Sequence, residues 1–157
     1  MSLASLVRRT ALGNFVQRSA ALPPATGQST DLFSIDGGQV LLTGFYGYVT
    51  VAIPNVSLDF DLALDPDDGG SDVALASLLA VDNKPAGTWL RLNTTAGGAL
   101  VDSLNVAYGM QLAVPIALDA GDIKLNVAGG GAVGTTARVK WGMSYVPLDT
   151  SARVTAV

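Results

Sequence analysis

The densest group of potential metal ligands in this chain is an acidic run at residues 65–72. It contains Asp65, Asp67, Asp68 and Asp72. Carboxylate oxygens suit Ca²⁺, and the Asp, Asp and Gly at the first, third and sixth places resemble the start of an EF-hand loop. The fifth place, however, holds Gly69 and the twelfth holds Ala76, where that loop needs further oxygen ligands. We therefore expect a solvated turn without a resident metal, and a loosely held cation as the alternative.

A second stretch, residues 129–134, formally satisfies the dinucleotide-binding pattern G-x-G-x-x-G. That chemistry needs a helix immediately afterwards, because the helix N-terminus faces the pyrophosphate. Residues 135–145 instead alternate between apolar and polar side chains, which is typical of a strand. The glycines therefore indicate a loop between strands, and no nucleotide cofactor is expected.

General acid–base or nucleophilic catalysis has few candidates. The chain has no His and no Cys, so histidine-based triads and thiol nucleophiles are absent. Asp59 and Asp61 are two residues apart on one expected strand, whereas paired catalytic carboxylates face each other across a substrate. We expect that the protein is not an enzyme and uses no cofactor.

Aromatic side chains could form a stacking platform for sugars or nucleic acid. The candidates are Tyr46, Tyr48, Trp89, Tyr108, Trp141 and Tyr145. Packing in a core or a subunit interface is the more common fate of aromatic residues in strands. From residue 31 onward the chain has six basic and thirteen acidic side chains, a formal charge of −7, which argues against a nucleic-acid partner.

Composition favours strands over helices. All acidic residues are Asp, which prefers turns, and there are 18 Gly in 157 residues. Only 14% of the residues are charged, which suggests that a second copy of the chain covers part of the surface. The uncharged stretch at 37–58 contains glycines, Pro54 and Asn55, so it predicts a strand, a turn and a strand, and no membrane partner.

Successive strands are expected across the body of the chain. The clearest alternation lies at 56–64, where Asp59 and Asp61 should face water. Residues 73–81 could form a buried strand or a short helix. The other expected strands lie at 32–35, 40–50, 88–93, 100–108, 110–118, 122–127 and 135–146. Gly37-Gly38 is expected to form a hairpin turn, and Leu112, Val114, Ile116 and Leu118 should lie on one face of their strand. This pattern predicts an all-β fold, a single sandwich, jelly-roll-like or barrel-like domain of about eight or nine strands.

The first 30 residues differ from the rest. They hold three arginines and no acid, and Pro23-Pro24 forces an extended stretch before the body at 31–157. Apolar residues at helical spacing favour a short helix or an irregular, extended segment. We expect an N-terminal arm at 1–30 that docks on a partner through seven interface residues. These are Leu3, Leu6, Arg8, Arg9, Leu12, Phe15 and Arg18.

Two stretches resemble a known group of proteins. They are Gly37-Gly38-Gln39-Val40-Leu41-Leu42-Thr43, which continues through residues 47–53, and Lys140-Trp141-Gly142-Met143-Ser144-Tyr145-Val146-Pro147-Leu148-Asp149. Both are similar to short proteins encoded among the head genes of tailed bacteriophages, which decorate the capsid. The resemblance covers most of residues 30–157, and its motifs are strand patterns.

The resemblance implies a viral structural role. Decoration (cement) proteins of this kind form trimers on the capsid surface, bind the major capsid protein and clamp neighbouring capsomers. It therefore implies a homo-oligomer, with a trimer favoured, that is made in the host cytoplasm and located on the virion. Two alternatives remain: another virion part such as a tail-tube, connector or fibre-base subunit, and a carbohydrate-binding β-sandwich with Trp89 or Trp141 as its platform.

Overall fold

The computed structural model describes residues 13–21, 27–93, 97–104, 111–130 and 136–157. Within these ranges the protein is all-β: eleven strands and no helix. In the same ranges, no helix is long and apolar enough to cross a membrane. The strands are β1 (Asn14–Ala21), β2 (Gln28–Asp36), β3 (Val40–Val51), β4 (Leu58–Pro66), β5 (Val73–Ala80), β6 (Thr88–Arg91), β7 (Val101–Leu104), β8 (Gln111–Leu118), β9 (Gly121–Gly129), β10 (Arg138–Pro147) and β11 (Arg153–Ala156).

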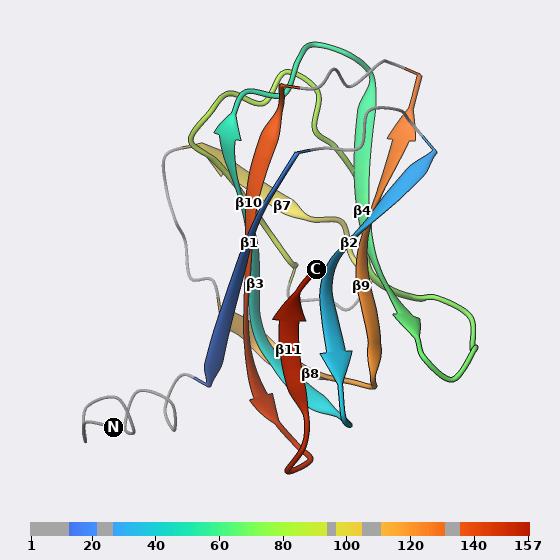
Figure 1. The fold of residues 1–157 in the computed structure, drawn as a ribbon. Helices are drawn as coiled ribbons and strands as arrows, with labels where there is room; N and C mark the ends of the chain where they lie inside the picture. Colours follow the sequence, from blue (N-terminus) through green and yellow to red (C-terminus); the bar gives the residue numbers. More distant parts are fainter. Residues whose placement is uncertain (1–12, 22–26, 94–96, 105–110, 131–135) are drawn as a thin grey trace, which may run out of the picture.

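Two antiparallel sheets form the fold (Figure 1). The six-stranded sheet has the order β1-β10-β3-β6-β7, and β8 pairs with β3 outside this path. The five-stranded sheet has the order β11-β2-β9-β4-β5. Figure 1 shows β1, β10 and β3 on one side of the molecule and β2, β9 and β4 on the other. The predicted all-β sandwich is therefore confirmed.

Alternating side chains explain why these segments form strands. In β4, Leu58, Phe60 and Leu62 are buried, while Asp59 and Asp61 lie on the outer side, as predicted. The strands β9 and β10 alternate in the same way, and β5 is a strand and not a helix. Each sheet thus contributes one apolar face to a shared core.

Aromatic side chains connect the two sheets at the centre of the core. Phe33 of β2 meets Phe45 of β3 edge to face, with ring centroids 6.0 Å apart. The Phe45 ring also lies 5.8 Å from Trp141 of β10. All three side chains are almost completely buried. The five-stranded sheet is therefore held in position by the same cluster that packs β3 against β10.

Two glycines make the pairing of β3 with β10 possible. Gly47 stands opposite Trp141, and a Cβ at Gly47 would lie 2.6 Å from the indole carbon Cζ3. Gly142 stands opposite Tyr46, and a Cβ there would lie 2.5 Å from the tyrosine Cε1. Each strand thus omits a side chain where the other places a large aromatic ring, on the core side at Trp141 and on the outer side at Tyr46.

The structure corrects the expected number of strands: the described residues form eleven, where eight or nine were expected. The two additional strands, β1 and β11, lie at the ends of the chain. Residues 14–21, assigned to the arm, are an extended strand that pairs with β10 over eight residues. Pairing across the sheet decides the conformation here, because a short apolar pattern alone does not specify helix or strand.

Two local expectations are wrong. Gly37-Gly38 looked like a hairpin turn, but it connects β2 and β3, which lie in different sheets. Val114 was expected on the buried face of its strand with Leu118, yet 66% of Val114 is exposed and Leu118 is buried. The β3–β8 ladder shifts register between Leu42 and Gly44, which interrupts the alternation that the sequence suggested.

The fit at Gly47 predicts a large stability difference between two glycine substitutions. Gly47→Ala should lower the free energy of unfolding by about 1–3 kcal/mol, because the new methyl group meets a buried indole. Gly130→Ala is the matched control, since no atom lies within 4 Å of the added Cβ. Urea unfolding at unchanged m-value measures both. Equal urea midpoints for the two variants would show that the close contact between position 47 and Trp141 does not affect the stability of the fold.

Candidate functional site: the outer face of the six-stranded sheet

An aromatic ladder crosses the outer face of the six-stranded sheet. Tyr46 and Tyr48 alternate with buried residues of β3, so both point away from the core. Trp89 of β6 stands opposite Tyr48, and their ring centroids are 4.7 Å apart. Trp89 also lies 5.3 Å from Tyr46, which stacks on Phe15 of β1 at 6.2 Å and 12°.

Tyr46 is the centre of this ladder. Its ring occupies the space above Gly142, and its Oη accepts a hydrogen bond from Gln17 Nε2. As a result Tyr46 is only 6% exposed although it lies on an outer face, whereas Phe15 is 56% exposed. The ladder is thus a fixed surface, anchored at Tyr46 and accessible at Phe15.

Basic side chains accompany the aromatic rings. Arg138 and Lys140 alternate with buried residues of β10, and Arg91 does so in β6, so all three lie on the outer face. Among the described residues of these strands, no carboxylate shares that face. The six-stranded sheet therefore presents aromatic rings together with positive charge.

The outer face of the five-stranded sheet has the opposite charge. Strand alternation and the pairing registers place six aspartates on it, against Lys124 and Arg153. The aspartates are Asp31, Asp36, Asp59, Asp61, Asp65 and Asp122. Several of these side chains have partners: Lys124 Nζ pairs with Asp65, Arg153 Nε lies 3.7 Å from Asp36, and Asn126 Nδ2 donates to Asp61 at 2.6 Å.

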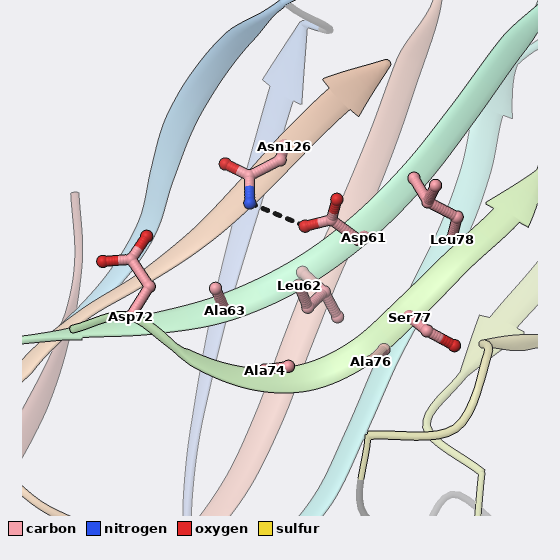
Figure 2. A pocket seen from close by; sticks show the side chains of 9 residues that line it. All are labelled: Asp61, Leu62, Ala63, Asp72, Ala74, Ala76, Ser77, Leu78 and Asn126. Atoms are coloured by element: carbon pink, nitrogen blue, oxygen red, sulfur yellow. Dashed lines mark hydrogen bonds between the residues drawn. The ribbon is translucent and has the colours of Figure 1, made fainter. Parts of the chain in front are cut away.

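A shallow hollow of about 510 Å³ lies on this acidic face over β4 and β5 (Figure 2). The residues that line it include Ala74, Ala76, Asp61 and Asp72. The Asp61 carboxylate is engaged by Asn126, as the dashed line in Figure 2 marks. Small alanine side chains line much of the hollow, and of its two carboxylates, Asp61 and Asp72, Asp61 is already held by the Asn126 amide.

The acidic run at 65–72 begins in the last two residues of β4 and continues into the turn that follows, and it does not assemble a cation site in the described residues. Asp65 pairs with Lys124, and Asp68 Oδ1 accepts a hydrogen bond from the Gly70 amide at 2.8 Å. Asp72 lines the hollow, and the Asp67 amide donates to the Ala120 carbonyl. No group of three carboxylates in the described part of the chain could hold a metal ion.

The predicted interface residues are only partly described. Leu3, Leu6, Arg8, Arg9 and Leu12 lie outside the described residues. Phe15 and Arg18 both lie on β1 but on opposite sides of it, since Phe15 stacks on Tyr46 and Arg18 stands opposite the core residue Trp141. Phe15 therefore belongs to the aromatic ladder, which the sequence did not associate with the arm.

The structure also separates the six candidate platform aromatics. Trp141 is completely buried, so it cannot bind a ligand by stacking. Tyr145 faces the core, where its Oη accepts a hydrogen bond from the Val154 amide at 3.1 Å. Tyr46, Tyr48 and Trp89 remain on the outer face, and Tyr108 lies outside the described residues. Alternation along β3 and β10 was the signal that could have separated these groups.

No protein-family model, curated protein or solved structure matches this chain.

The two tryptophans should differ strongly in their access to solvent. Trp89→Phe should remove most of the acrylamide-quenchable emission and shift the remaining spectrum to the blue, because Trp141 is buried. Stern–Volmer quenching of the folded protein measures this. Unchanged quenching in the variant would mean that Trp141, and not Trp89, faces solvent.

The ion pair on the acidic face predicts a pKa change. The hydrogen bond to Asp65 raises the pKa of Lys124 above its ordinary value of 10.5; burial opposes this, and the charges of Asp65, Asp72 and Asp31 add to it. Asp65→Asn should lower that pKa, as an NMR titration of the Lys124 side chain would show. Asp59→Asn, on the same face, is the control and should have little effect.

The raised pKa of Lys124 makes the free energy of unfolding depend on pH. A raised lysine pKa stabilises the fold fully below the ordinary pKa of 10.5, and the contribution is lost as pH rises through the folded pKa. Asp65→Asn should therefore flatten the alkaline end of the stability profile. An identical profile in the variant would show that the pair contributes nothing to folding.

Proposed function

We propose that this chain is a virion structural protein, a decoration subunit that binds the outer surface of a tailed-phage head. In this role it stabilises capsomer junctions by self-association and by exchange of its N-terminal segment. Such a function requires many contacts and no catalytic centre, because repeated weak contacts over a lattice provide avidity.

One observation carries this proposal. The two stretches that resemble head decoration proteins, residues 37–43 with 47–53 and residues 140–149, cover most of β3 and β10. These strands are far apart in the sequence but form one ladder, with the reciprocal fit of Trp141 on Gly47 and Tyr46 on Gly142. The resemblance thus involves the structural centre of the sandwich and not scattered surface residues.

A carbohydrate-binding module is the second candidate, because Trp89 and Tyr48 lie together on an outer face. The surface on which a sugar ring stacks would contain Trp89 and not Trp141, because Trp141 is buried. Quenching or enhancement of Trp89 emission by soluble sugars would favour this function over decoration. A tail-tube, connector or fibre-base subunit is the other alternative, and it would assemble into rings or rods.

The native mass in dilute solution tests the proposal. Light scattering should give a trimer of about three times the 16.0 kDa chain mass. Purified protein should also bind phage heads that lack this subunit. Failure to bind such heads would contradict the decoration function, and a larger ring or rod would favour the tail or connector alternative.

The N-terminal segment can be tested separately. Removal of residues 1–12 leaves β1 intact, because the strand begins at Asn14. This truncation should weaken head binding by about tenfold or more, because the same contacts would be lost at every site that the subunits occupy on the head. A circular dichroism spectrum that matches that of the full chain is the control for folding. Undiminished binding would show that residues 1–12 do not dock on a partner.

A further inference from the structure

We propose that the outer face of the six-stranded sheet is the docking surface of this subunit, and that it binds a protein surface rich in carboxylates. The inference rests on the proposed function, in which that partner is the shell of the phage head. The outer face of the five-stranded sheet then faces solvent.

The charges of the two faces differ in sign. Arg138 and Lys140 lie on the docking face together with Arg91, and the described strand residues that pair with Arg138 and Lys140 include no carboxylate. On the opposite face six aspartates outnumber Lys124 and Arg153. Complementary potentials orient an approaching partner and exclude wrong ones. An acidic partner is therefore attracted to one side of this sandwich and repelled by the other.

The uncharged side chains favour the same side. Phe15, Tyr48 and Trp89 lie on the docking face, and Val146 of β10 is exposed there as well. Interfaces are enriched in aromatic residues and Arg and depleted in Asp, and Trp, Tyr and Arg dominate their binding energy. The acidic face carries six aspartates, and several of its charges are paired within the chain.

A protein surface fits these observations better than nucleic acid. Three cations on a body with a net charge of −7 supply little attraction for a long polyanion, which binds through many phosphate contacts. A second copy, contacting this face through its own acidic face, is also complementary. Because the two faces lie on opposite sides of the sandwich (Figure 1), that contact would grow into open-ended stacks and not a closed trimer.

Two single variants test the proposal, each of which reverses one positive charge on one of the two faces. Lys140→Glu reverses a charge on the docking face, and Arg153→Glu makes the same change on the acidic face, at a side chain that is 72% exposed. Binding to heads that lack the subunit is measured for both, with melting temperature and native mass as controls. We expect about tenfold weaker binding for Lys140→Glu, little change for Arg153→Glu, and weaker wild-type binding at high salt.

A second assay separates the docking face from the function. Immobilised poly-L-glutamate should capture the wild-type protein and the Arg153→Glu variant at low salt, but not Lys140→Glu. Capture without head binding would contradict the proposed function and support the docking face. Absence of both would overturn both proposals.

Other outcomes would overturn the docking face alone. Equal head binding by the two variants, or a loss confined to Arg153→Glu, would exclude this surface. Stacks that grow with concentration and disappear in Lys140→Glu would identify a second copy as the occupant. Tight binding of a thymidine oligonucleotide that depends on Lys140 would identify a nucleic acid instead.

Discussion

The fit of the Trp141 indole over Gly47 constrains the rest of this sandwich, because β3 and β10 form the central ladder of the six-stranded sheet. The indole fills the core and packs on Phe45, which in turn meets Phe33 of the other sheet. Any side chain at position 47 would displace the ring and disturb all three. The distance between the two sheets therefore depends on the absence of one side chain.

The same ladder arranges the surface. Gly142 allows the Tyr46 ring to lie flat against the outer side of β10, where it supports Phe15 and Trp89. Aromatic packing on the outer side thus mirrors aromatic packing in the core. One pair of strands specifies both the interior of the protein and the surface that we propose as its docking face.

Only 14% of the residues are charged, and these charges are distributed unevenly over the two outer faces. Six of the thirteen aspartates lie on the outer face of one sheet, and Phe15, Tyr46, Tyr48 and Trp89 lie with three cations on the outer face of the other. A molecule with two such different faces is suited to lie between a partner and solvent. Since a fold alone does not define function, these surfaces carry more of the functional argument than the sandwich itself.

The sequence by itself determined that the protein is all-β and where eight of its strands lie, because alternation in segments such as β4 and β9 directly reports which side chains are buried. It left residues 73–81, which form β5, open between a strand and a helix. It did not reveal β1 or β11, whose short or mixed patterns become strands only through pairing with β10 and β2. It also could not show that Trp89 lies beside Tyr46 and Tyr48, because these contacts join β6 to β3. Only the tertiary structure decided these points, since strand order and the outer faces arise from contacts between residues distant in the chain, which local periodicity does not encode.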